Sequence, residues 1–241
     1  MTRADYGYDA PYALVAFGFL AVVCGVGAAV AWWFMPPHAA GPTLAFVLFL
    51  ANTVSFCYTT RRGKFLEWER ILHSLQLRGS EIVLDVGCGR GAVLTSVARI
   101  LTTGRATGVD IWSAKDQSGN SKDVTLRNAA LEGVGHRVHI VTADMRALPF
   151  PEATFDLVVS SLAIHNVRSN DNRRKAVAEA FRVVKPGGRM AIADIRATSV
   201  YAGALRTLGA SNIRRQRLGY RFWWGNPFAA TTLLTASKPP V

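Results

Sequence analysis

The fold of this chain is decided by the stretch V-L-D-V-G-C-G-R-G at residues 83–91, a short apolar run that breaks into a loop with glycine at every second position. Such a run predicts a buried strand that ends in a tight turn, where glycine lets a ligand approach the backbone closely. Residues 92–101 predict the helix that follows. Gly87, Gly89 and Ala92 also fit the G-x-G-x-x-A pattern of dinucleotide-binding turns, so the stretch alone leaves the ligand open.

Three successive predicted strands end in an acidic residue. These residues are Asp85 in the first strand, Asp110 after residues 106–109, and Asp144 at the end of residues 138–144. The C-terminal ends of parallel strands meet at one edge of a sheet, where open α/β folds bind their ligands. Carboxylates gathered at that edge favour a cationic, adenosine-bearing ligand over a pyrophosphate. Further strand-like runs follow at 155–161 and 188–194.

Five segments in this order resemble the class I S-adenosylmethionine-dependent methyltransferases, within them the methyltransferase type 11 group that includes ubiquinone and menaquinone C-methyltransferases. The segments are residues 84–91, 108–110, 143–150, 155–161 and 184–189. The resemblance implies a Rossmann-like α/β fold with a seven-stranded sheet, S-adenosylmethionine as the cofactor, and methyltransferase activity. A nicotinamide-dependent reductase is the alternative that the glycine turn leaves open.

The resemblance assigns the cofactor site to the three strand ends. Asp85 is expected to hold the amino end of the methionine moiety. Asp110 is expected to bind the ribose hydroxyls, because a carboxylate can accept both protons, and Asp144 is expected to accept the adenine amino group. The set also contains Gly87, Cys88, Gly89, Gly91, Ile111, Trp112, Met145 and Ser160. Each acid has a simpler interpretation as a turn residue at a strand end.

Methyl transfer from a sulfonium needs little acid chemistry, because the leaving group is neutral. The protein must chiefly align the acceptor and exclude water. Where the acceptor has a proton to lose, His165, just past the fourth strand, is the candidate base or acceptor-positioning residue; its simpler role is to order the loop. Asp116, Asn120 and Asn166 are expected substrate contacts. The first two lie in the polar loop 112–121, which has a second interpretation as a solvated insertion.

Two apolar runs without a charged residue, 12–35 and 43–60, precede this module. At 1.5 Å per residue they span roughly 36 and 27 Å, enough to cross a ~30 Å hydrocarbon layer. The segment P-P-H-A-A-G-P at 36–42 predicts a turn, so residues 1–60 are expected to form a membrane anchor of two transmembrane helices. A signal peptide is the competing interpretation of the first run. The second run could instead form an interfacial or dimer-forming helix. A homo-oligomer that assembles through the hairpin is therefore a further expectation.

The charges predict an orientation. Arg61, Arg62 and Lys64 follow the second run, whereas the turn has no Lys or Arg, so the positive-inside rule places the module in the cytoplasm as part of a multi-pass membrane protein. Of 28 basic and 16 acidic residues, 27 and 14 lie beyond residue 60, which gives that part a net charge of +13. Such a balance favours an anionic partner, the acidic cytoplasmic leaflet ahead of nucleic acid.

The domain boundaries follow from these patterns. Residues 61–80 predict an amphipathic linker helix, lying along the membrane surface or packed on the sheet. Residues 81–241 form the expected methyltransferase domain, with its last strands at 213–223 and 229–237. The three cysteines have neither a metal-binding pattern nor a disulfide framework, so no metal is expected.

Together these patterns predict a membrane-anchored methyltransferase that moves a methyl group from S-adenosylmethionine to a small, lipophilic acceptor such as a quinone-like ring, a phenol or a lipid. The bilayer would present such an acceptor at high effective concentration. One alternative is an S-methyltransferase acting on small thiols or sulfide. The other is a non-catalytic, membrane-bound scaffold that binds the cofactor.

Overall fold

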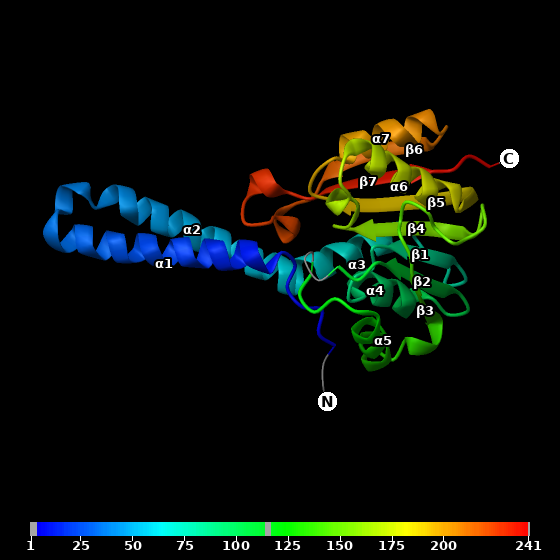
Figure 1. Cartoon of the computed structure of the whole chain (residues 1–241), viewed down its shortest axis with the longest axis horizontal. Coiled ribbons are helices and arrows are strands. Elements are labelled where there is room, and N and C mark those ends of the chain that lie inside the picture. The colour runs from blue at the N-terminus through cyan, green and yellow to red at the C-terminus, as the bar shows by residue number, and fades with distance from the viewer. Residues whose placement is uncertain (1–3, 114–116, 241) are drawn as a thin grey trace.

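The computed structural model describes residues 4–113 and 117–240, which form an α/β module and a helical hairpin that projects from one side of it (Figure 1). The hairpin consists of helices α1 (Pro11–Phe34) and α2 (Ala40–Tyr58), joined by the 3-10 turn η1 (Pro36–His38). Proline at the start of α1 and of η1 suits these positions, because the first turn of a helix does not use its N–H groups.

The hairpin helices are long and apolar enough to cross a membrane. The second continues without a break as residues 40–74, through the π-helical turn η2 (Thr59–Gly63) into α3 (Lys64–Ser74). Only 11% and 6% of the residues in the two apolar windows are buried within the protein. A core helix of a soluble protein would be mostly buried, and these two helices are not.

The module is built on a seven-stranded sheet with the order β3-β2-β1-β4-β5-β7-β6. Its strands are β1 (Ile82–Val86), β2 (Arg105–Asp110), β3 (Val138–Thr142), β4 (Phe155–Ser161), β5 (Val184–Asp194), β6 (Ser211–Arg217) and β7 (Thr232–Ser237). Strands β1 to β5 are parallel, and β7 pairs antiparallel with both β5 and β6. The strand order reverses between β1 and β4, the point at which open α/β sheets bind ligands. The predicted seven-stranded, Rossmann-like fold is confirmed.

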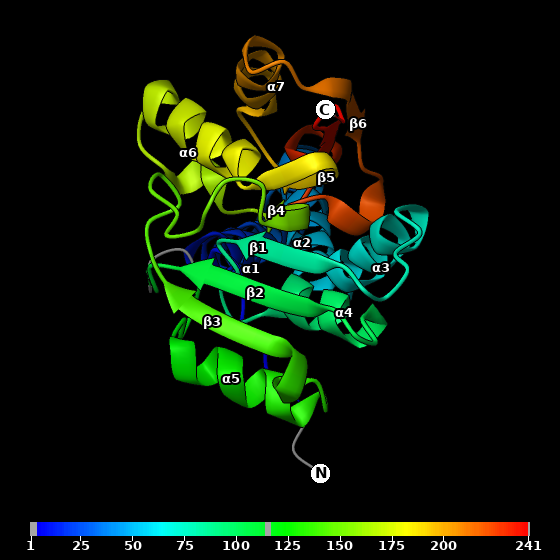
Figure 2. The same cartoon turned by 90° about the vertical axis from the view of Figure 1, so that its right-hand side faces the viewer.

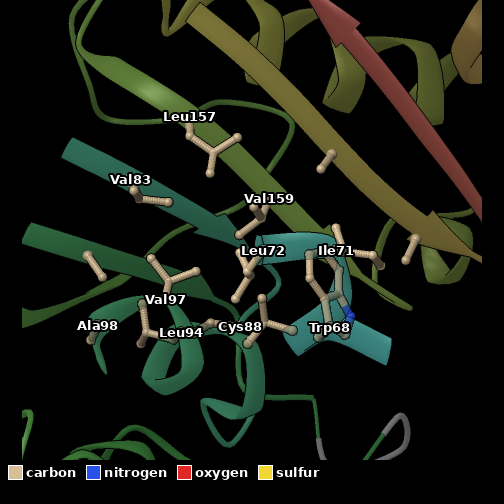
Figure 3. Packing of buried hydrophobic residues seen from close by; sticks show 14 of the residues in the cluster. Trp68, Ile71, Leu72, Val83, Cys88, Leu94, Val97, Ala98, Leu157 and Val159 are labelled. Atoms are coloured by element: carbon tan, nitrogen blue, oxygen red, sulfur yellow. The ribbon is translucent and has the colours of Figure 1, made fainter. Parts of the chain in front are cut away.

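Helices cover both faces of the sheet, as parallel strands require. The helices α3 and α4 (Ala92–Ile100) lie on one side, and α6 (Asn170–Arg182) on the other (Figure 2). The remaining helices are α5 (Lys122–Leu131) and α7 (Thr198–Thr207). On the first side, Trp68, Ile71 and Leu72 of α3 pack against strand residues such as Val83 and Val159 (Figure 3).

Helix α3 lies within the expected linker segment, and its apolar face packs on the sheet. The side chain of Trp68 is 2% exposed, and its indole Nε1 donates a hydrogen bond to Ser161 Oγ (2.9 Å). One face of the helix thus belongs to the core of the module. Because α2 and α3 form one continuous helix, the hairpin is rigidly connected to the core of the module.

The last two strands are shorter than predicted. Strand β6 ends at Arg217 and β7 begins at Thr232, so residues 218–231 form a connection with two 3-10 turns, η5 (Tyr220–Phe222) and η6 (Pro227–Ala229). Aromatic residues favour strands in general. Here Phe222 and Trp224 are instead buried against the base of the hairpin, where the rings of Phe56 and Trp224 lie 5.1 Å apart.

The chain before α1 also lies against the module, although residues 1–60 were expected to form a separate anchor. The hydroxyl of Tyr6 hydrogen-bonds Thr95 Oγ1 (2.8 Å) and Glu132 Oε1 (3.0 Å). Arg90 forms an ion pair with Asp5 (2.9 Å). The segment 4–10 and the inner end of α2 thus contribute contacts to the module, and a cut at residue 60 would remove them.

Candidate active site

A cavity of about 680 Å³ lies at the C-terminal ends of the parallel strands. Its walls come from the glycine turn after β1, the end of β2, and the loops after β3, β4 and β5. The remaining wall comes from Asp9 and Ala10 before α1, from Lys64, Phe65 and Trp68 of α3, and from Trp224. The cavity thus extends from the predicted cofactor residues to the base of the hairpin.

The glycine turn forms one wall. Gly87 has φ +74°, and a Cβ on it would lie 2.2 Å from the Cβ of Ala163, so a side chain fits neither the backbone nor the space. The amide of Gly89, at φ +50°, donates to Asp110 Oδ2 (2.8 Å). Gly91 precedes α4 at φ +86° and lies outside the cavity lining, because its role is to start the helix.

Asp85 faces the cavity from strand β1 as a buried carboxylate. It is 2% exposed, and neither carboxylate oxygen has a hydrogen-bond partner among residues 4–113 and 117–240. Burial, with a smaller contribution from Asp110, raises the pKa of Asp85 to about 8. An unpaired buried carboxylate is costly, and a cationic group in the cavity would offset this cost. Asp85 therefore fits a ligand that carries a positive charge.

Asp110 ends β2 and holds the loops around it. Besides the Gly89 amide, it accepts hydrogen bonds from the Trp112 amide (2.7 Å) and Asn120 Nδ2 (3.3 Å), both at Oδ1. Asn120 and Ile111 line the cavity with it. Trp112 does not line the cavity, because its indole Nε1 donates to Thr142 Oγ1 (2.8 Å) on the outer side of β3.

Asp144 lines the cavity but already has a cationic partner. Nε of Arg146 donates to both carboxylate oxygens (3.0 and 2.9 Å), and its Nη2 donates to Oδ2 (2.5 Å). These hydrogen bonds from Arg146 lower the pKa of Asp144. A ligand amino group at this position would share the carboxylate with Arg146. Met145, between the two, also lines the cavity.

His165 and Asp194 form a pair at the opposite end of the cavity. His165 lies in the 3-10 turn η4 (Ile164–Asn166), and its backbone amide donates to Asp194 Oδ2 (3.0 Å). Nδ1 of His165 lies 2.5 Å from Asp194 Oδ1, a close polar contact without the geometry of a hydrogen bond. Asp194 is fully buried at the end of β5, where Tyr201 also donates to it (3.1 Å).

The remaining predicted site residues are Cys88, Asn166, Ser160 and Asp116. Cys88 and Asn166 line the cavity, and burial raises the pKa of the Cys88 thiol. Ser160 lies outside the lining because its hydroxyl donates to the carbonyl of Val86 within the sheet (2.8 Å), whereas its neighbour Ser161 lines the cavity. Asp116 lies outside the described residues.

Several lining residues were missed by sequence reasoning. Asp9 contacts Lys64 Nζ (2.5 Å) and accepts from Gln117 Nε2 (3.1 Å), which joins the segment before α1 to the loop after β2. The only sequence signal for this contact was an acidic residue directly before a long apolar run. Asp194, which contacts His165 but does not itself line the cavity, had a clearer signal, an acid at the end of a predicted strand like the three that were noted.

The two ends of the cavity therefore differ in chemistry. The acidic end, formed by Asp85, Asp110 and Asp144 around the glycine turn, suits a cationic ligand with hydroxyl and amino groups. The opposite end, formed by His165, Leu162, Ile195 and Trp224 with Arg168 and Arg196 beside them, combines apolar side chains with an imidazole and two guanidinium groups. This arrangement allows a transfer between two bound molecules.

Comparisons with known proteins agree with this geometry. Residues 84–192 match the family model of the methyltransferase domain (Methyltransf_11). The chain is 33% identical over 131 residues to the sterol 4-C-methyltransferase strm-1 of Caenorhabditis elegans, over 54% of this chain and 36% of that protein. It is 33% identical over 129 residues to the ubiquinone/menaquinone biosynthesis C-methyltransferase UbiE of Escherichia coli, over 53% of this chain and 48% of that protein. The matched part thus spans about half or less of these relatives.

Among solved structures, the fold is similar to that of a SAM dependent methyltransferase from Aquifex aeolicus. The TM-score is 0.56 at 18% sequence identity, over 70% of this chain and 88% of that one. At this identity the likeness establishes the fold, and the family model establishes the kind of domain.

Proposed function

We propose that this chain, in which residues 84–192 form an S-adenosylmethionine-dependent methyltransferase domain, is a membrane-anchored enzyme that methylates a small lipophilic acceptor. The observation that carries the proposal is the extent of the cavity. One end meets the unpaired Asp85, and the other meets Ala10 and Trp224 at the base of an apolar hairpin.

The acidic end fits the cofactor. Asp85 would hold the amino group of the methionine moiety and Asp110 the ribose hydroxyls, while the glycine turn leaves room for the ligand beside its backbone. The adenine would lie near Met145, with its amino group beside Asp144 and Arg146. When bound, S-adenosylmethionine supplies a methyl group activated by a positively charged sulfur.

The opposite end would hold the acceptor. The matched relatives are named for sterol and quinone C-methylation, and acceptors of that class are apolar. Leu162, Val167 and Ile195 would pack against an apolar acceptor, and Arg168 and Arg196 beside them would meet its polar groups. A hairpin in the bilayer would hold the cavity close to acceptors dissolved in the membrane, which raises their effective concentration.

His165 would take the proton that the acceptor loses. Asp194 lies beside Nδ1, so Nε2 is the nitrogen left for the acceptor. Asp194 is a positioning residue in this scheme, because it acts through the imidazole. The segment 4–10 and Lys64 close the cavity on one side and help to exclude water.

Transfer of label from S-adenosylmethionine into membrane lipid tests this proposal. Membranes that contain the full chain are incubated with methyl-labelled cofactor, with and without small thiols, and extracted into organic solvent. We expect label in the organic phase without added thiol, and, at a cofactor concentration below its dissociation constant, about tenfold fewer counts for membranes with the Asp85→Asn variant. Label that depends on an added thiol would favour the S-methyltransferase alternative. Cofactor binding without any transfer would favour the scaffold.

A further inference from the structure

The connection between β6 and β7, residues 218–231, is called here the rim loop. It leaves the sheet at the same edge as the cavity, because Arg217 of β6 and Asp194 of β5 both pair with Thr232 of β7. In Figure 1 the rim loop, in orange to red, lies on the side of the module from which the hairpin projects. Its residue Trp224 lines the cavity.

The rim loop packs against both helices of the hairpin, at a point well away from the end of the hairpin that joins the module. Asn226 Nδ2 donates to Asn52 Oδ1 of α2 (3.0 Å). A Cβ on Gly225 would lie 2.8 Å from Asn52 Oδ1 and 3.5 Å from the ring of Phe17 of α1, so only glycine allows this approach. Both hairpin helices therefore contact the loop.

The distance of this contact from the charged end of α2 follows from helix geometry. Asn52 lies nine residues before Arg61, the first charged residue after the hairpin, which corresponds to about 13 Å along the helix. With Arg61 and Arg62 at the headgroups and α2 across a ~30 Å hydrocarbon layer, Gly225 and Asn226 lie within the leaflet on the side of the module.

The side-chain amides of Asn52 and Asn226 form hydrogen bonds within the protein, as an apolar environment requires. Asn52 donates from Nδ2 to the carbonyl of Leu48 (2.8 Å) and accepts from Asn226 at Oδ1. Asn226 Oδ1 in turn accepts from the amides of Phe228 (3.0 Å) and Ala229 (3.2 Å). The two asparagines thus use their donors and acceptors on one another and on the backbone.

The tip of the rim loop carries an unpacked aromatic ring. Phe228 is 93% exposed, and Tyr220 at the near end of the loop is 59% exposed. Burying a phenylalanine side chain is worth on the order of 2 kcal/mol, which this ring does not gain within the protein. Arg217 precedes the loop and Arg221 lies within it, and anionic headgroups would attract both.

We propose that the rim loop inserts into the leaflet on the side of the module, with Phe228 among the acyl chains and Tyr220 and Arg221 at the headgroups. The inference rests on the membrane-spanning hairpin of the proposed function. The insertion gives the module a second membrane contact, which fixes its orientation. The cavity end at Trp224 then faces the leaflet, and a lipophilic acceptor reaches it without crossing water.

Spin-label accessibility in nanodiscs of phosphatidylcholine and phosphatidylglycerol tests the inference on the full chain. The parent carries Cys24→Ala and Cys57→Ala, and Cys88 stays unlabelled because it is buried and its thiol pKa is raised. Single labels are placed through Phe228→Cys, through Val26→Cys in α1, and through Thr207→Cys on the exposed side of α7. The measured quantity is relaxation by oxygen against relaxation by a water-soluble nickel chelate.

The labels at positions 228, 26 and 207 test insertion of the rim loop separately from the membrane-spanning hairpin on which it rests. We expect the labels at 228 and 26 to be at least several-fold more accessible to oxygen than to nickel, and the label at 207 to show the reverse. A label at 228 that behaves like the one at 207, while 26 remains in lipid, overturns the insertion of the rim loop and leaves the hairpin intact. Nickel-accessible labels at both 228 and 26 overturn the membrane hairpin as well.

Discussion

Nδ1 of His165 lies 2.5 Å from Oδ1 of Asp194, although 29 residues separate the two in the chain. The turn after β4 carries the histidine and the end of β5 carries the aspartate, and the pairing of these neighbouring strands brings them together. Asp194 is buried completely, so it also ties the histidine loop to the core. In the proposed function His165 is the predicted proton acceptor, and Asp194 positions it.

Removal of the imidazole should slow turnover without weakening cofactor binding. For His165→Ala we expect kcat to fall by about 10²-fold or more, the usual contribution of a general base, while the affinity for S-adenosylmethionine stays within about twofold. Asp194→Asn should lower kcat less, because it misorients the imidazole but keeps it. Single-turnover rates and binding calorimetry check both. An unchanged kcat in His165→Ala would reduce the histidine to a packing residue.

The glycine turn allows a matched pair of variants. Gly87 and Gly133 both have φ above +70°, but a Cβ on Gly87 meets Ala163 at 2.2 Å, whereas one on Gly133 meets nothing within 4 Å. Both alanine variants strain the backbone, by about 1 kcal/mol or more. Gly87→Ala alone should abolish cofactor binding. Equal binding by the two variants would show that the close approach of Gly87 to Ala163 is not needed for the site.

The buried Asp85 should make the cofactor-free protein less stable as the pH rises. Its pKa is about 8 in the folded protein against 3.8 in the unfolded chain. Between these values the folded state binds a proton that the unfolded state has lost, so the free energy of unfolding decreases with rising pH. The Asp85→Asn variant has no titrating carboxyl group at this position, so this decrease in the free energy of unfolding should disappear.

Thermal unfolding without cofactor checks this sign. The gain in Tm from Asp85→Asn should be larger at pH 8 than at pH 5. Lys185→Met, which removes a half-buried pair with Asp156 far from the cavity lining, serves as a control whose effect should be the same at both pH values. A gain that is the same at both pH values would contradict the raised pKa of Asp85.

The inner end of the hairpin should stabilise the module. Phe56 is 3% exposed and packs against Trp224, whereas Phe19 on α1 is 66% exposed. Phe56→Ala should lower the free energy of unfolding of the module by about 3 kcal/mol, in the usual range for a buried phenylalanine, and Phe19→Ala by far less. Denaturant unfolding in micelles, followed by loss of cofactor binding, measures both. Equal effects would mean that the hairpin and module are independent.

Local patterns predicted the strands and their acidic ends, because a buried strand that ends in a glycine turn is encoded within about ten residues. Asp85, Asp110 and Asp144 were identified in this way, and all three line one cavity. Contacts between distant segments were not predictable from such patterns. Asp9 meets Lys64, and Trp224 meets Phe56, only because the hairpin returns the chain to the module.

The central claim is that the unpaired Asp85 holds a cationic cofactor, and titration calorimetry of the full chain in micelles with S-adenosylmethionine tests it most directly. Bound cation favours the ionised carboxylate, so the affinity should rise between about pH 6 and 7.5, by at most tenfold per pH unit, with release of a proton. Asp85→Asn should lower the affinity at pH 7.5 by about tenfold or more and abolish the pH dependence. Absence of binding by the native chain, or equal and pH-independent binding by both proteins, would contradict the account.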